Sequence, residues 1–314
     1  MATSELLKYN KKPLWTRIKK ELVTNKYLYL LLLPVLAYYL IFLYLPMFGL
    51  VIAFKDYSIG KGVLGSAWVG LKYFKEFLSG IYFTRTLRNT LIISCATIVF
   101  GFPVPIIFAL LLNEIRGKRF KKFVQTSTYL PHFISMVVIC GMITNFFGTD
   151  GLITSIIAKF GGENLNYVAE EKWFRTIYVI TDIWQGFGWG SIVYLAALAG
   201  VDQALYEAAT IDGAGRFKQI LHITLPGILP TIMTMLILRL GQVMSVGYEK
   251  IILLYSAPTY EVADVISSYV YRTGIVGARY SYSAAVGIFQ SVINVIMLVL
   301  ANKISAKLTD TSLF

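Results

Sequence analysis

The sequence predicts an all-α protein that crosses a membrane six times, and three observations predict this fold class. Of the 314 residues, 56% are hydrophobic and only 15% are charged, whereas a soluble domain has about 25% charged residues. The mean hydropathy is +0.65. Six segments of 19 to 28 residues contain no Asp, Glu, Lys or Arg, and about 20 helical residues cross the hydrocarbon core of a bilayer. These segments are residues 27–54, 89–113, 123–149, 183–201, 219–238 and 280–302. The composition therefore argues against a soluble enzyme.

The first span, at about residues 27–53, follows a basic stretch, which is also how a signal peptide is built. The charge-free segment is 28 residues long, however, and it ends at Phe54-Lys55-Asp56 without a small-residue cleavage site. We therefore expect a retained helix. It contains Pro34 and Pro46, which membrane helices tolerate where neighbouring helices satisfy the freed carbonyl groups.

The other five spans follow in order along the chain. They are expected at about residues 89–113, 123–147, 176–200, 226–239 and 280–302. Glycines cluster in the fourth of these six spans, between Trp184 and Gly190, and such glycines let membrane helices approach closely. The spans form one domain, residues 27–303, between an N-terminal tail (1–26) and a C-terminal tail (304–314).

Lys and Arg are concentrated on one side of this topology. Both tails and the loops 113–123 and 201–225 lie on the same side of six spans, with sixteen Lys and Arg against seven Asp and Glu. The opposite side, which includes an expected outer loop at 248–279, has eleven against nine. Because cytoplasmic segments are enriched in Lys and Arg, we expect both termini in the cytoplasm. The net charge of +12 is thus an orientation signal, and nucleic acid is not an expected partner.

The 201–225 loop differs from the rest of this side because its acidic residues outnumber its basic ones. Asp202 can cap a short helix over residues 203–212, and Gly213 can end it in a left-handed conformation. A second short helix is expected over residues 216–221, before Pro226 opens the fifth span. The first helix would present two small alanines beside a glutamate, which suits docking into a groove. An ordinary amphipathic loop helix is the alternative.

The residues of this loop resemble a known motif. Glu207-Ala208-Ala209, three residues, Gly213, nine residues and then Ile223-Thr224-Leu225-Pro226 match the EAA loop of binding-protein-dependent ABC importer permeases at every fixed position. Further segments are similar to the carbohydrate branch of that family, in particular to LplB-like permeases for complex saccharides and to the first permease of maltose and glycerol-phosphate importers. These segments are residues 45–50, 53–57, 68–71, 88–90 and 280–287.

The resemblance implies the type I ABC importer permease fold, in which the EAA loop (201–226) couples the permease to a separate ATPase. The residues that it assigns to this coupling are Glu207, Ala208, Ala209, Asp212, Gly213, Ile223, Leu225 and Pro226. Glu207 would pair with a basic residue of the ATPase, and Asp212 would cap the second helix. The implied partners are a second homologous permease, a dimer of ATPase subunits carrying ATP and Mg, an extracytoplasmic solute-binding protein and the lipid bilayer. The implied location is the cytoplasmic (inner) membrane of a prokaryote.

The chain itself has no recognisable catalytic, metal or cofactor motif. It lacks the G-x-x-x-x-G-K-[ST] phosphate loop, so a partner would hydrolyse ATP. His132 and His222 are interpreted as structural, and Cys95 and Cys140 as small buried hydrophobic residues. We therefore expect a transporter subunit rather than an enzyme, with no cofactor of its own.

Polar and aromatic side chains in and near the later spans are the candidates for the substrate path, because burying polar groups in a bilayer is costly. They are Trp184, Gln185, Trp189, Arg239, Gln242, Tyr248, Gln290 and Asn294. Rings would stack on a neutral sugar and amides would bind its hydroxyl groups. Each residue also has a structural interpretation: Gln and Asn bridge helices, Trp and Tyr lie at the membrane interface, and Arg239 can pair with Asp182 or Glu249.

The expected function is ATP-driven import of a saccharide, an oligosaccharide in particular, by alternating access between two arrangements of the spans. Two alternatives stay open. The same machinery could carry an amino acid, a peptide or a phosphate-containing solute. An independent secondary carrier would need carboxylates inside the membrane, and the six segments contain none; only Asp182 borders one.

Overall fold

A computed structural model describes residues 14–309 and 312–313 of the chain. Within these residues, regular structure is helical except for two short antiparallel strands, β1 (Lys55–Asp56) and β2 (Ala67–Trp68). Five helical segments are long and apolar enough to cross a membrane: Lys26–Phe54, Phe83–Glu114, Met136–Lys159, Arg216–Leu240 and Tyr280–Lys307. A sixth candidate is the pair Glu171–Ala199 and Gln203–Ile211, which is bent by 71°. The predicted all-helical membrane protein is therefore confirmed for the described part of the chain.

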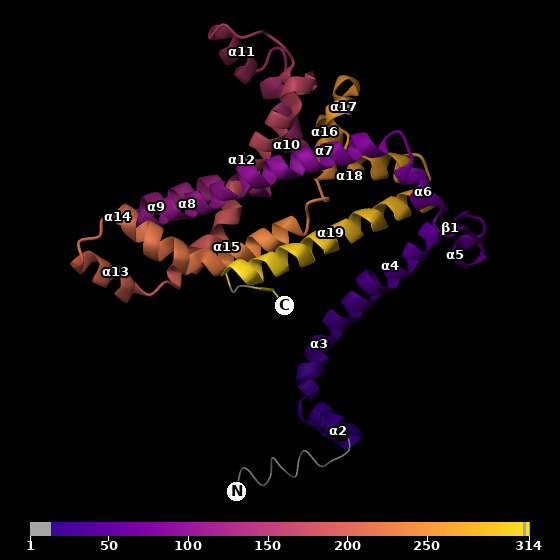
Figure 1. Cartoon of the computed structure of the whole chain (residues 1–314), viewed down its shortest axis with the longest axis horizontal. Coiled ribbons are helices and arrows are strands. Elements are labelled where there is room, and N and C mark those ends of the chain that lie inside the picture. The colour runs from indigo at the N-terminus through magenta and orange to yellow at the C-terminus, as the bar shows by residue number, and fades with distance from the viewer. Residues whose placement is uncertain (1–13, 310–311, 314) are drawn as a thin grey trace.

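The first span leads away from the other helices (Figure 1). Its elements are α2 (Leu14–Thr24), α3 (Lys26–Tyr38), the π-helical η1 (Tyr39–Tyr44), α4 (Leu45–Met47) and the 3-10 helix η2 (Phe48–Phe54). No residue of α3, η1 or α4 is buried. Only the end of η2 reaches the core, through the fully buried Ala53. Of the expected N-terminal tail, residues 1–13 lie outside the described residues, and the side chains that are described in α2 are exposed.

The segment after the first span forms a small cap at one end of the bundle. It contains β1, α5 (Gly62–Gly65), β2 and α6 (Lys72–Leu78). The hydroxyl of Tyr73 donates a hydrogen bond to Asp56 Oδ1 at 2.6 Å. Burial and this bond raise the pKa of Tyr73 to about 12, so the hydroxyl remains a donor at physiological pH.

The second span contains a π-helical segment, and the third is broken. The second consists of α7 (Phe83–Ala96), the π-helical η3 (Thr97–Gly101) and α8 (Pro103–Glu114). The third span, expected over residues 123–147, is divided in the structure. Helix α9 (Lys118–Tyr129) and the 3-10 helix η4 (Leu130–Phe133) end before α10 (Met136–Phe147), and α11 (Leu152–Lys159) follows. The candidate span is Met136–Lys159. Pro131 cannot donate a backbone hydrogen bond, and the break leaves Ile134 extended. Ser135 then starts α10 by accepting a hydrogen bond from Val138 N.

The core is organised around α12 (Glu171–Ala199), a 29-residue helix that follows the 3-10 helix η5 (Tyr167–Ala169). At one end Tyr194 and Leu198 pack with Ile106 of α8, and towards the other Phe174 and Ile177 pack with Ile93 of α7. Gly188 of α12 lies against the backbone of Thr128 in α9.

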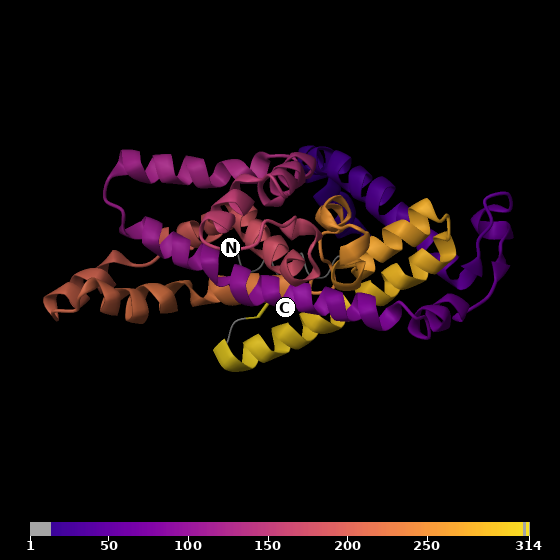
Figure 2. The ribbon, with the colours of Figure 1, turned by 90° about the horizontal axis from the view of Figure 1, so that it is seen from above.

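The remaining helices are α13 (Gln203–Ile211), α14 (Arg216–Gln219), the π-helical η6 (Ile220–Thr224), α15 (Leu225–Leu240) and α19 (Tyr280–Thr309). In Figure 2 the orange α13–α14 segment projects beyond the other helices at one end of the molecule, opposite the β1–β2 cap. Helix α19 continues seven residues past the expected end at Asn302, so most of the expected C-terminal tail is helical. Residues 310–311 and 314 of that tail lie outside the described residues.

The expected outer loop at 248–279 is instead largely packed structure. It forms α16 (Tyr248–Leu254), η7 (Ala257–Thr259), α17 (Tyr260–Ala263), α18 (Ile266–Val270) and the π-helical η8 (Tyr271–Val276). Some of its charged residues are buried: Asp264 is fully buried and pairs with Arg272 at 2.7 Å and with Arg85 of α7 at 3.2 Å. The segment therefore folds into the protein where its buried charges pair with charges of opposite sign, and its expected position on the outer side stays a prediction.

Candidate functional site

The loop between α12 and α15 has the conformation that its sequence predicts. The carboxylate of Asp202 caps α13 by accepting a hydrogen bond from Ala204 N at 2.9 Å. Gly213 has φ +75°, a left-handed conformation that favours glycine. The amide of Ala214 then bonds to the carbonyl of Ala209 at 2.8 Å. The loop is thus a well-formed helix and turn.

Two details of this loop differ from the prediction. The second short helix does not end at 221, because α14, η6 and α15 form one continuous segment from Arg216 to Leu240. Pro226 therefore lies inside a continuing helix, in the first turn of α15. Asp212 does not cap the second helix: Gly215 occupies that position without a side-chain hydrogen bond, and Asp212 is the C-cap of α13.

Hydrogen bonds and apolar contacts brace the loop from inside. Tyr206 of α13 and Thr224 of η6 share a hydrogen bond between their hydroxyls at 2.9 Å. The amide of Gln219 donates to Thr210 Oγ1 at 3.0 Å and to the carbonyl of Ala214 at 3.1 Å. Ile223 packs against the buried cluster at this end of the bundle. The loop is therefore positioned relative to α15.

The outer surface of the loop carries the motif residues together with apolar side chains. Glu207, Ala208 and Gly213 are exposed, and Ala209 is half-buried. Ile211 and Phe217 are 87% and 76% exposed, and the motif reasoning missed both. Their apolar character in a loop expected to face water was the available signal. An apolar surface beside a carboxylate is typical of a docking site.

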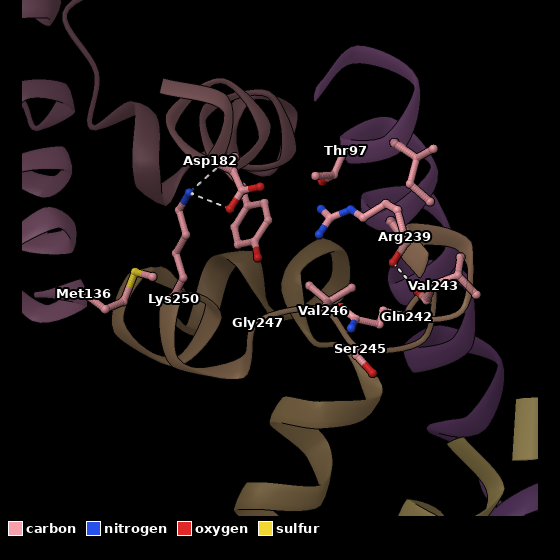
Figure 3. A pocket seen from close by; sticks show the side chains of 13 residues that line it. Thr97, Met136, Asp182, Arg239, Gln242, Val243, Ser245, Val246, Gly247 and Lys250 are labelled. Carbon is pink, nitrogen blue, oxygen red and sulfur yellow. Dashed lines mark hydrogen bonds and ion pairs between the residues drawn. The ribbon is translucent and has the colours of Figure 1, made fainter. Parts of the chain in front are cut away.

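A second feature is a cavity of about 260 Å³ among the spans. Asp182 comes from α12, Arg239 from the end of α15, Gln242 from the turn after it and Lys250 from α16, and Figure 3 shows these side chains around the cavity. The structure thus joins Arg239 and Gln242, two of the substrate-path candidates, with two charged residues that were not among them.

Lys250 neutralises Asp182. Its side chain is 1% exposed, its Nζ lies 3.7 Å from Asp182 Oδ1, and it donates a hydrogen bond to the carbonyl of Tyr178 at 3.1 Å. The ammonium group also lies 4.6 Å from the centre of the Tyr178 ring. The expected pairing of Arg239 with Asp182 or Glu249 is not found: among the described residues, no ion pair or side-chain hydrogen bond reaches the Arg239 guanidinium. Lys250 was missed because it falls in the segment expected as a loop.

A neighbouring cavity of about 310 Å³ shares Thr97, Asp182 and Arg239 with the first. Its other walls are mainly apolar and include Phe187 and Tyr194. Asp182 and Arg239 therefore lie where a polar and an apolar cavity meet.

The other candidates lie elsewhere. Trp184, Gln185 and Trp189 do not line either cavity; Trp189 instead stacks on His132 with ring centres 4.7 Å apart. Tyr248 stacks on Tyr271.

Gln290 and Asn294 of α19 hold the turn that follows α15. The Gln290 amide donates to the carbonyl of Met244, and Asn294 accepts from Met244 N and donates to Ser245 Oγ, both at 2.9 Å. Their structural interpretation is therefore favoured, and their contact with substrate stays a prediction. In the described part of the chain, no group of three or more His, Cys, Asp and Glu side chains could hold a metal ion.

Known proteins are similar to this chain in both sequence and fold. Residues 101–310 match a protein family described as "Binding-protein-dependent transport system inner membrane component". In Bacillus subtilis (strain 168), the polygalacturonan/rhamnogalacturonan transport system permease protein YteP is 45% identical over 299 residues, which are 95% of this chain and 93% of YteP. Protein LplB of the same organism is 47% identical over 291 residues, 92% of each chain.

A crystal structure of a bacterial alginate ABC transporter, in complex with an alginate pentasaccharide-bound periplasmic protein, contains a chain of the same fold. The TM-score is 0.86 and the sequence identity 42%, and the match covers 95% of this chain and all of the other.

Proposed function

This chain belongs to the family of binding-protein-dependent transport system inner membrane components, and we propose that it moves an acidic oligosaccharide inward across the cytoplasmic membrane. As a permease of an ABC importer, it is a transporter membrane subunit and not an enzyme. The observation that carries the proposal is the braced loop of residues 201–226, which matches the EAA motif at each fixed position and projects from one end of the bundle.

The loop is the proposed contact with the ATPase dimer that binds ATP and Mg. Ala208 and Ala209 leave room for α13 to enter a groove, Glu207 supplies a charge for a basic partner residue, and Gly213 permits the turn. Exposed Ile211 and Phe217 add apolar area. Ile223, Leu225 and Pro226 lie where the loop joins the span, so that ATP-driven closure of the ATPase would move α15 with α13.

The remaining partners are a second homologous permease and a solute-binding protein. The exposed first span, which lacks buried residues from Lys26 to Met47, offers an apolar surface that a second permease can cover in part, with lipid covering the rest. The alginate transporter binds a periplasmic protein that holds the saccharide, and the proposal extends this arrangement to the present chain. The basic tails and the α13 end then face the cytoplasm.

An acidic oligosaccharide is favoured over the other cargoes. The names of the similar proteins refer to polygalacturonan, rhamnogalacturonan and alginate, of which polygalacturonan and alginate are polymers of uronic acids. A phosphate-containing solute has weaker support, because the sn-glycerol-3-phosphate transport system permease protein UgpA of Yersinia pestis is only 28% identical to this chain. The names of these similar proteins do not refer to amino acids or peptides. The independent secondary carrier is disfavoured by the family to which the chain belongs.

The test uses the complete complex in proteoliposomes and compares uptake of trigalacturonate with ATP hydrolysis. Gly213→Ala and Glu207→Ala should each lower uptake per ATP hydrolysed about tenfold or more, a loss equivalent to about 1.4 kcal/mol of coupling. Gly161→Ala is a matched control, since Gly161 also has positive φ (+85°) and, like Gly213, has nothing within 4 Å of an added Cβ atom. Glu163→Ala, at another exposed acid, is the control for Glu207→Ala. Unchanged coupling with Glu207 and Gly213 both substituted would overturn the assigned role.

A further inference from the structure

The Arg239 guanidinium lies at the junction of the two cavities, and its position has a consequence for substrate choice. We propose that Arg239 is a carboxylate-binding site that selects saccharides containing uronic acid residues during passage through this subunit. This inference rests on the proposed function and adds to it one side chain and the chemical group that the side chain binds.

The charges around the cavity leave one positive charge without a counterion. The cavity is lined by Arg239, Lys250 and Asp182, and Lys250 already pairs with Asp182 at 3.7 Å. Figure 3 shows the Arg239 guanidinium directed into the cavity from the side opposite Lys250. Charged residues in membrane spans are costly and are retained where they face a water-filled cavity and serve a function. A single anionic group from the substrate would balance the remaining charge.

The pairing of Lys250 with Asp182 is what keeps Arg239 available. Asp182 lines both cavities together with Arg239, so a free Asp182 carboxylate would be a nearby competitor for the guanidinium. Lys250 is almost completely buried and also bonds to the carbonyl of Tyr178, which fixes its ammonium group beside Asp182. Lys250 is therefore a positioning residue rather than a ligand.

The surroundings of Arg239 suit a sugar carboxylate better than a small inorganic anion. A guanidinium group binds a carboxylate through two parallel hydrogen bonds. Gln242 and Ser245 beside it can bind hydroxyl groups, while Phe187 and Tyr194 form an apolar wall in the adjoining cavity, as sugar rings require. The three charged side chains of the cavity have a net charge of +1, which one carboxylate balances. A doubly charged phosphate would leave an excess negative charge beside Asp182.

The experiment measures ATP-driven uptake by proteoliposomes that contain the complete complex, with two probes: trigalacturonate and its fully methyl-esterified, uncharged form. The variants are Arg239→Gln and Arg239→Lys. Arg119→Gln removes the same charge from an exposed position in the first turn of α9 and serves as the control. Since the binding protein is unchanged in every preparation, its own preference cancels when variants are compared.

We expect Arg239→Gln to reduce trigalacturonate uptake by about ten- to hundredfold, as for loss of hydrogen bonds to a charged group, and to change uptake of the ester by less than about threefold. Arg239→Lys should be intermediate, because it keeps the charge and loses the fork geometry. Unchanged trigalacturonate uptake in Arg239→Gln, or equal losses for both probes, would overturn the proposal.

Failure of the proposed function has a different signature. If the wild-type complex takes up a neutral oligosaccharide such as maltotriose but not trigalacturonate, the proposed acidic cargo is wrong and the carboxylate site fails with it. If the wild-type complex takes up trigalacturonate and Arg239→Gln does so equally well, the carboxylate site alone is wrong. If the wild-type complex takes up no saccharide with ATP, saccharide import itself is wrong.

Discussion

The contact between α12 and α9 allows a stability prediction from a single added methyl group. Gly188 is buried in α12, and a Cβ atom there would lie 2.2 Å from the carbonyl oxygen of Thr128 and 2.6 Å from its carbonyl carbon. Both atoms belong to the α9 backbone, so no side-chain rotation can relieve the overlap. Gly188→Ala therefore forces α9 away from α12 by about 1 Å or more, in an interior packed as densely as a crystal.

The change in the free energy of unfolding for Gly188→Ala is the difference between two opposing contributions. Overpacking of this kind costs about 1–3 kcal/mol, and a displaced backbone places this case at the upper end. Replacing Gly by Ala within a helix recovers up to about 1 kcal/mol. The expected net loss is about 2 kcal/mol, which for a chain of 314 residues lowers the midpoint of thermal unfolding by about 3 °C.

The assay is heating of the purified protein in detergent at one fixed rate, followed by the fraction that remains monodisperse. A fixed rate is needed because membrane proteins unfold irreversibly and the apparent midpoint depends on the scan. Gly186→Ala is the matched control: it lies in the same helix, and nothing lies within 4 Å of a Cβ atom there. It should leave the midpoint unchanged or raise it slightly. Equal midpoints for Gly188→Ala and Gly186→Ala would refute the reasoning.

Two further predictions concern the ends of the bundle. Tyr206→Phe removes the hydroxyl that bonds to Thr224 at 2.9 Å. We expect the free energy of unfolding to fall by about 1 kcal/mol and uptake per ATP hydrolysed to fall as well. Unchanged uptake per ATP would contradict a bracing role for this hydrogen bond. Asp264→Ala leaves Arg272 and Arg85 without their fully buried partner. The expected loss in the free energy of unfolding is about 3–5 kcal/mol, measured by the same heating assay. A loss below about 1 kcal/mol would show that these ion pairs are solvated.

The sequence predicts the spans and the α13 turn well because both depend on local rules. A charge-free stretch of about 20 residues has few alternatives to a membrane helix, and Gly213 with Asp202 specifies a helix end and a helix start over a few residues. Pro131 also marks, within the local sequence, the place where the third span is interrupted. It does not predict the interruption by itself, because proline within a span is compatible with both a continuous and an interrupted helix.

The charged cavity could not be predicted in the same way. Lys250 and Asp182 are 68 residues apart in the sequence, and nothing in their local context indicates that α16 turns back into the protein beside α12. The buried Asp264 shows the same effect, since it pairs with Arg85 of a distant helix. Charge compensation is a property of tertiary packing. A loop assignment based on charge therefore fails wherever opposite charges meet in the interior.

Helix α15 physically connects the two functional features. It begins at Leu225, next to Thr224, which bonds to the α13 helix, and it carries Arg239 in its last turn. Its 16 residues span about 24 Å at 1.5 Å per residue. Gln290 and Asn294 hold the turn that follows. If the proposed ATPase contact and carboxylate site are both right, a displacement of the α13 loop by the ATPase would be transmitted along one helix to the guanidinium, so that ATP-driven motion and release of a bound carboxylate would involve the same helix.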